Sequence, residues 1–172
     1  MLKVCLPPAE RQSQNAPAPL RERHQAFAHD WALPPGAAWL SAQEIASALH
    51  VTRRHVFHLI LDGSFDRVID IRSPAAAQSY WRIWRRSFLR FGQRARGEAC
   101  ARFYFDAELA EALARHPSTL SGQQLAAHFR CSKQHIANLS PEFPNVGVST
   151  AHRAFVRLSQ GELMNFIKKR LV

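Results

Sequence analysis

The sequence predicts a mainly α-helical protein with small β-hairpins, built from two tandem copies of one unit. Three observations lead to this prediction. A stretch of 21 residues recurs without gaps 80 positions later in the chain. Each copy holds two short amphipathic segments, and each segment starts at a helix-capping residue. Short runs of β-forming residues then follow in both copies.

The repeat aligns residues 39–59 with residues 119–139. The identical pairs are Leu40/Leu120, Ser41/Ser121, Gln43/Gln123, Ala46/Ala126, His55/His135 and Leu59/Leu139. A second match, at an offset of 75, aligns residues 81–91 with residues 156–166. The offsets differ by five, so the first copy has a longer intervening stretch, as expected of an insertion in a loop.

The first copy predicts two helices separated by a short turn. Ser41 and Thr52 are the expected N-caps, and Glu44 completes a capping box with Ser41. Gly63 is placed to end the second helix. The residues expected to face the core are Ile45, Ala46, Leu49, Val56, Leu59 and Ile60. Helices joined by so short a turn cross steeply, which is the helix-turn-helix arrangement.

The second copy repeats these features. Ser121 and Ser132 are the expected caps, and Pro141 ends the second helix. Each helix pair precedes a predicted hairpin, with strands at 65–71 and 82–84 in the first copy and at 146–148 and 155–158 in the second. Helices over 87–96 and 160–171 close the two units. This order of elements is that of a winged helix-turn-helix.

The motifs Leu40-Ser-Ala-Gln-Glu-Ile-Ala46 and Val51-Thr-Arg-Arg-His-Val-Phe57, with Gly63 and Arg82-Ile-Trp-Arg-Arg-Ser-Phe-Leu-Arg-Phe91, resemble the excisionase-type, MerR-like winged helix family. Phage excisionases and small prophage regulators belong to that family. The resemblance covers residues 39–92, and residues 119–169 more weakly. It implies DNA binding through the second helix and the wing. This chain departs from the family in having two units and a long first hairpin.

Four segments follow from these patterns. Residues 1–38 hold six of the ten prolines and predict an extended, mobile segment with a short helix over 20–31. Residues 39–97 form the first winged unit and residues 119–172 the second. Residues 98–118 form a linker with a helix that Asp106 caps and Pro117 ends, and its Leu109 and Leu113 face inward.

The composition favours a polyanionic partner. The 172 residues carry a formal charge of +10, and only four of the 23 cationic residues are lysines, which leaves 19 arginines. No apolar run approaches the length of a membrane span, and the three cysteines form no C-x-x-C pair. We therefore expect a soluble, cytoplasmic, nucleoid-associated protein with reduced thiols. We expect no metal, cofactor or enzymatic activity, because metal-ligand clusters, phosphate loops and nucleophile motifs are absent.

The expected DNA contacts lie mainly on the second helix of each pair. Arg54 and His58 fall opposite the apolar face, and Arg53, His55 and Phe57 flank them. The corresponding residues of the second copy are Lys133, Gln134, His135 and Asn138. The wings contribute Arg67, Arg72 and Arg153. A stripe of cations extends over residues 82–102, with Arg82, Arg86 and Arg90 the expected phosphate contacts, because only one acid lies in that stretch.

These expectations converge on a sequence-specific protein that binds double-stranded DNA, most simply a transcriptional regulator of a mobile element. It would act as a monomer with two heads or as a homodimer. Two alternatives stay open at this point. An excisionase or recombination directionality factor would also bend DNA and contact a recombinase. A plasmid replication or partition protein would bind iterated sites. An enzyme subunit or nuclease accessory is a third class that the residues do not favour.

Overall fold

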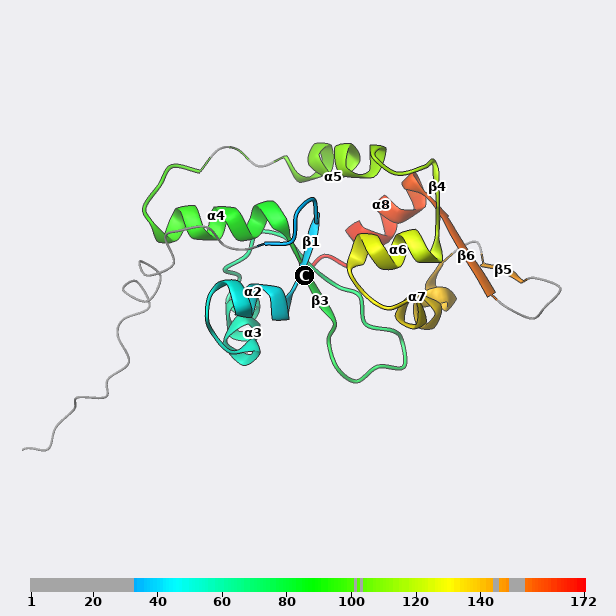
Figure 1. The fold of residues 1–172 in the computed structure, drawn as a ribbon, viewed down its shortest axis with the longest axis horizontal. Helices are drawn as coiled ribbons and strands as arrows, with labels where there is room; N and C mark the ends of the chain where they lie inside the picture. Colours follow the sequence, from blue (N-terminus) through cyan, green and yellow to red (C-terminus); the bar gives the residue numbers. More distant parts are fainter. Residues whose placement is uncertain (1–32, 101, 103, 144–145, 149–153) are drawn as a thin grey trace, which may run out of the picture.

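The computed structural model describes residues 33–100, 102, 104–143, 146–148 and 154–172. The chain is mainly helical with two small antiparallel sheets, as the sequence predicts (Figure 1). The helix expected over 20–31 lies outside the described residues. No helix among the described residues is long and apolar enough to cross a membrane.

Two segments share one order of elements, and we call them the first and second repeat. The first repeat consists of β1 (Trp39–Ser41), α2 (Ala42–Ala48), α3 (Arg53–Leu61), β2 (Val68–Asp70), β3 (Trp81–Trp84) and α4 (Arg85–Ala95). The second repeat consists of β4 (Thr119–Ser121), α6 (Gly122–Phe129), α7 (Lys133–Leu139), η1 (Ser140–Glu142), β5 (Val146–Val148), β6 (Ala154–Ser159) and α8 (Gln160–Lys169). Helix α5 (Phe105–Ala114) lies between them in the chain.

Each repeat holds a three-stranded sheet rather than the two-stranded hairpin that the sequence predicts. The strand orders are β1-β3-β2 and β4-β6-β5, so the strand before the helix pair lies against the last strand of the hairpin. Ser41 lies opposite Arg82 in the first sheet, and Ser121 lies opposite Arg157 in the second. Three-residue strands such as β1 are too short to show an alternating pattern, so only their partners define them.

The predicted caps of both helix pairs are confirmed. The hydroxyls of Ser41 and Ser121 each accept a hydrogen bond in a capping box, and Thr52 and Ser132 cap the second helix of each pair. Gly63 follows α3 with φ of +68°, where its missing Cβ removes the steric cost of the left-handed region.

Two other helix starts differ from the predictions. Helix α4 begins at Arg85, two residues before the predicted start at Ser87. Ser87 is buried within the helix, and its hydroxyl accepts a hydrogen bond from the backbone N–H of Arg67 instead of capping α4. Helix α5 begins at Phe105, which places Asp106 in the first turn rather than at the N-cap. Leu109 and Leu113 are buried as predicted.

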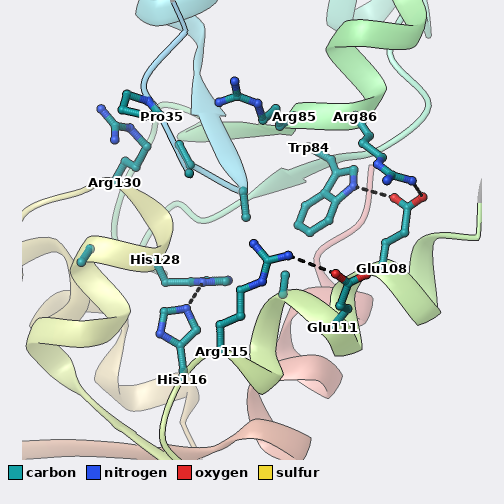
Figure 2. Close-up of a pocket in the computed structure, with 15 residues that line it drawn as sticks. Pro35, Trp84, Arg85, Arg86, Glu108, Glu111, Arg115, His116, His128 and Arg130 are labelled. Carbon is teal, nitrogen blue, oxygen red and sulfur yellow. Dashed lines mark hydrogen bonds and ion pairs between the residues drawn. The ribbon is translucent and has the colours of Figure 1, made fainter.

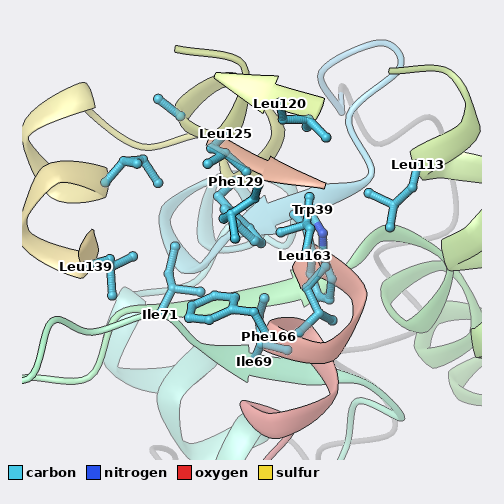
Figure 3. Packing of buried hydrophobic residues seen from close by; sticks show 14 of the residues in the cluster. Trp39, Ile69, Ile71, Leu113, Leu120, Leu125, Phe129, Leu139, Leu163 and Phe166 are labelled. Atoms are coloured by element: carbon cyan, nitrogen blue, oxygen red, sulfur yellow. The ribbon is translucent and has the colours of Figure 1, made fainter. Parts of the chain in front are cut away.

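The protein has two hydrophobic clusters, and one of them joins the repeats. The first cluster is internal to the first repeat and lies under α2, α3 and α4. The second combines Trp39, Ile69, Ile71 and Trp84 with α5 and with most of the buried side chains of the second repeat (Figure 3). The indole of Trp39 lies edge-on to Trp84, with 4.9 Å between ring centroids, and 6.4 Å from Phe129. Apolar residues of both repeats are therefore buried in one hydrophobic core.

The C-terminal residues extend the first sheet. Leu171 bridges Ile69, the Asp70 N–H donates to the Arg170 carbonyl at 3.2 Å, and the Val172 N–H donates to the Val68 carbonyl at 3.0 Å. The end of the second repeat thus covers the open edge of β2 in the first, where unpaired backbone groups would otherwise face solvent.

Candidate nucleic-acid interface

Helix α3 presents a polar face because its cap and its apolar residues fix its orientation. The Thr52 hydroxyl accepts a hydrogen bond from the His55 N–H at 3.2 Å and starts the helix. The side chains of Val56, Leu59 and Ile60 are buried, while Arg53, Arg54 and His58 are exposed. His55 is half-buried at the edge of this face. The outward face that the sequence predicts is therefore confirmed as solvent-accessible.

Phe57 supports one side of this face. Its ring is half-buried and packs edge-on against Trp81 of β3, with 4.9 Å between ring centroids. The guanidinium of Arg53 lies 5.6 Å from the centre of the same ring, within the range of a cation–π interaction. Phe57 thus couples α3 to the hairpin and restricts the side chain of Arg53.

Helix α7 repeats the arrangement with different polar groups. The Ser132 hydroxyl accepts a hydrogen bond from the His135 N–H at 3.1 Å, and Ile136 and Leu139 are buried. Lys133, Gln134 and Asn138 are exposed. The side-chain amide of Gln134 donates to the amide oxygen of Asn138 at 3.0 Å, one turn along the helix. This face therefore offers amide donors and acceptors where α3 offers guanidinium groups.

The two helices lie on the same side of the molecule in one view. Helix α3, the loop 71–80 and α7 follow one another from left to right along the lower edge of Figure 1, with β6 and β5 beyond α7. Helices α4, α5 and α8 lie above them in that view.

His135 does not belong to the exposed face. It is half-buried, its Nε2 donates to the Ile71 carbonyl at 2.6 Å, and its ring stacks on Tyr80 with 4.1 Å between centroids. A carbonyl only accepts, so the proton of this imidazole lies on Nε2. The prediction that His135 faces DNA is therefore wrong in its geometry, because both partners come from the hairpin of the first repeat.

Arg82 is also placed differently from the prediction. Its side chain is buried, with a residue exposure of 4%. Its guanidinium donates to the carbonyls of Phe129, Arg130 and Trp81, and it lies 4.3 Å from the ring centre of Tyr80. The group binds the C-terminal end of α6, whose last carbonyls have no partner within the helix. It is not available to a phosphate.

Three arginines of the basic stripe on α4 pair with acids from other elements. Arg86 pairs with Glu108 of α5, and Asp66 accepts from Arg90 at 3.0 Å and from Arg94 at 2.8 Å. The prediction of unpaired cations considered only acids near in sequence, whereas Asp66 precedes Arg90 by 24 residues. The stripe is consequently part of a network of ion pairs.

The wing residues lie in different settings. The exposed Arg67 donates to the Asp66 carbonyl at 2.7 Å, and its guanidinium lies 5.5 Å from the ring centre of Phe105. Arg72 is exposed and its Nε lies 3.4 Å from the Asp70 carboxylate. Arg153 lies outside the described residues.

The cations at the starts of α3 and α7 differ from the ion-paired cations of α4, α5 and α8. Nine of the 18 lysines and arginines among the described residues form ion pairs, namely Arg72, Arg86, Arg90, Arg94, Arg96, Arg115, Arg130, Lys168 and Arg170. Within the described ranges, Arg53, Arg54 and Lys133 form no ion pair. The positive charge of these three residues is therefore not compensated locally.

A cavity of about 640 Å³ lies between the repeats, lined by residues 35–38, the start of α4, α5 and the end of α6 (Figure 2). His128 and His116 line this cavity: the Trp39 indole N–H donates to Nε2 of His128 at 3.2 Å, and Nδ1 of His128 lies 3.2 Å from Nε2 of His116. Burial, aided by the charge on His116, lowers the pKa of His128 from 6.5 to about 4. His128 is therefore a neutral hydrogen-bonded core residue at pH 7.

The glutamates of this cavity each pair with an arginine, Glu108 with Arg86 and Glu111 with Arg115. No group of three metal-binding side chains comes together in the part of the chain that the structure describes.

No protein-family model, curated protein or solved structure matches this chain significantly.

Proposed function

We propose that this chain is a sequence-specific double-stranded DNA-binding protein with two tandem winged helix-turn-helix units, acting as a transcriptional regulator of a mobile element. Helices α3 and α7 are the recognition helices, and each enters a major groove with its N-terminal end. The hairpins β2–β3 and β5–β6 are the wings, and they lie near the phosphates beside each groove.

One observation supports this proposal above the others. The exposed cations at the starts of α3 and α7 have no acidic partner among the described residues, whereas Arg86, Arg90 and Arg94 of α4 each contact a carboxylate. An uncompensated cation on a capped, outward helix end is available to a phosphate or to the edge of a base. The overall charge of +10 adds long-range attraction to DNA.

Residue chemistry assigns different bases to the two helices. The Arg54 guanidinium suits the O6 and N7 acceptors of guanine, which it binds as a fork. Gln134 and Asn138 carry amides, which suit the N6 and N7 atoms of adenine. Arg53 and Lys133 lie one position earlier, at the first residue of each helix, and contact the flanking phosphates.

The proposal is tested by selecting binding sites from random duplex DNA with the full chain and with Arg54→Ala. We expect the wild type to select a motif with a conserved guanine. Arg54→Ala should lose the preference at that position and bind the wild-type site with about 10-fold or more lower affinity, because a forked contact contributes roughly 1–3 kcal/mol of discrimination.

Arg115→Ala is the matched control, because Arg115 is exposed on α5 and paired only with Glu111. It should leave both the motif and the affinity unchanged. Failure of the wild type to bind any duplex would refute the proposed function. An unaltered motif with Arg54→Ala would show that α3 is not the recognition helix.

A further inference from the structure

The contact between the two repeats is not reciprocal. The sequence repeat makes Arg82 equivalent to Arg157, and each lies opposite the capping serine of its own sheet. The buried Arg82 binds the carbonyls of Phe129 and Arg130 in the second repeat. Arg157, in contrast, is exposed. If a two-fold axis related the repeats, Arg157 would make the same contact with the first repeat.

The residues that Arg82 contacts also have equivalents, and these confirm the polarity. His50 of the first repeat corresponds to Arg130 of the second, and both take a left-handed conformation, with φ of 51° and 52°. Arg130 also forms an ion pair with Glu44 across the contact between the two repeats, which we call the seam. The reciprocal pair would join His50 to Gln124, which has no charge. The first repeat therefore uses one surface at the seam, and the second repeat uses a different one.

The hairpin of the first repeat lies against the recognition helix of the second. Tyr80 stacks on His135, and the Ile71 carbonyl accepts from the same imidazole. Tyr80 also lies over the guanidinium of Arg82, so the hairpin contact and the seam form one continuous structure. The C-terminal residues that pair with β2 and the shared hydrophobic cluster hold the same orientation.

From these contacts we infer that the protein recognises an asymmetric DNA site in which two base blocks have the same polarity and a fixed spacing of one helical turn. This inference rests on the proposed function and adds the class of site. The order along the duplex is α3, first hairpin, α7, second hairpin, as these elements follow one another in Figure 1. Major groove, minor groove and next major groove alternate in the same way along a duplex, where successive major grooves lie about 34 Å or 10–10.5 base pairs apart.

A palindrome is the site expected of a two-fold dimer, since operator symmetry mirrors protein symmetry. A head-to-tail pair lacks this two-fold axis, and in the proposed arrangement both helices point in the same direction along the DNA. Because the two recognition helices carry different side chains, the wild-type site has two unlike blocks. The selected wild-type sequence therefore does not show whether the two blocks run in the same or in opposite directions.

Making the two recognition faces alike reveals the polarity. We propose the triple variant Lys133→Arg, Gln134→Arg and Asn138→His, which gives α7 the outward residues of Arg53, Arg54 and His58. All three replaced side chains are exposed, so the fold should be retained, which circular dichroism and thermal unfolding would check. Site selection from random duplex DNA is then carried out with the wild-type chain and with the variant.

The variant is expected to select the α3 block twice as a direct repeat, with the two copies about 10 base pairs apart. An inverted repeat would overturn the inference, and so would a single isolated block. The proposed function would survive either result, because DNA would still be bound with sequence preference. Absence of any selected motif for the wild type would instead refute the function itself.

The fixed spacing has its own test with the wild-type site. Inserting five base pairs between the blocks turns one of them to the opposite face of the duplex, and inserting ten restores the face but doubles the distance. Both insertions are expected to reduce affinity by about 100-fold or more, since only one helix then engages. Tolerance of the ten-base-pair insertion would show that the repeats move independently and would overturn the fixed spacing.

Discussion

Replacing Arg82 with alanine is the most direct test of the seam between the repeats. The guanidinium is buried, has no acidic partner among the described residues, and is satisfied by backbone carbonyls. Two of these carbonyls, those of Phe129 and Arg130, belong to the second repeat and end helix α6. The substitution removes both cross-repeat hydrogen bonds and the stacking contact with Tyr80.

The magnitude follows from those contacts. A hydrogen bond with a charged partner contributes about 1.5–3 kcal/mol to stability, so two bonds at the lower end contribute about 3 kcal/mol. Burying the guanidinium costs part of this, but truncation also leaves two helix-end carbonyls unsatisfied and opens space beside Tyr80. We expect Arg82→Ala to lower the free energy of unfolding by about 3 kcal/mol, and the midpoint of thermal unfolding by about 6–12 °C.

The assay is urea denaturation followed by far-ultraviolet circular dichroism and tryptophan fluorescence. Arg157→Ala is the matched control, because it removes the equivalent arginine at an exposed position, and it should change the free energy of unfolding by less than about 0.5 kcal/mol. Arg82→Lys keeps the charge but not the planar fork, so it should restore only part of the loss.

Equal small losses for Arg82→Ala and Arg157→Ala would refute the reasoning, since they would show that the guanidinium does not hold the repeats together. A DNA-binding measurement separates this role from direct phosphate contact. At temperatures where the variant stays folded, its salt dependence of binding should match that of the wild type, whereas loss of a phosphate contact reduces the slope by about one.

Two further predictions concern pH and ion pairs. The pKa of His128 is about 4 in the folded protein and 6.5 when unfolded, so the unfolded state binds more protons between these values. Stability should therefore be complete above pH 6.5 and fall with decreasing pH by about 1.4 kcal/mol per unit towards pH 4. His128→Gln, which keeps an acceptor for the Trp39 indole, should remove this slope between pH 6.5 and 5, and an unchanged slope would contradict it. Because Arg90 is held in an ion pair with Asp66, Arg90→Ala should leave the salt slope of DNA binding unchanged while lowering the free energy of unfolding by about 1 kcal/mol or less. A slope reduced by about one would show that Arg90 contacts phosphate.

Local structure was predictable because its signals are local. Ser41, Thr52, Ser121 and Ser132 cap the helices that the sequence assigns to them, and each cap satisfies a backbone N–H only three residues away. The apolar faces of α3 and α7 are buried where the helical spacing places them. These signals need no knowledge of the rest of the fold, so they fix the exposed faces as well.

The seam was not predictable for the opposite reason. Arg82 binds backbone carbonyls 47 and 48 residues away, and a carbonyl carries no residue identity for a pattern to detect. Asp66 pairs with two arginines that lie more than 20 residues further along the chain. A count of nearby charges therefore overstated the free positive surface of α4, and the alignment of the repeats left their contact undetermined.

The seam changes what the duplication contributes to recognition. Two DNA-binding units on a flexible tether each bind their base block independently, and the tether only raises the effective concentration of the second unit. Two DNA-binding units fixed by a common core must fit both base blocks at once. A mismatch or shift in one block then cannot be relieved by movement of one unit relative to the other. The distance between the blocks then contributes to specificity along with the base contacts. If the chain binds DNA as proposed, its specificity depends on Arg82 and Trp39 as well as on Arg54, although neither Arg82 nor Trp39 reaches the surface.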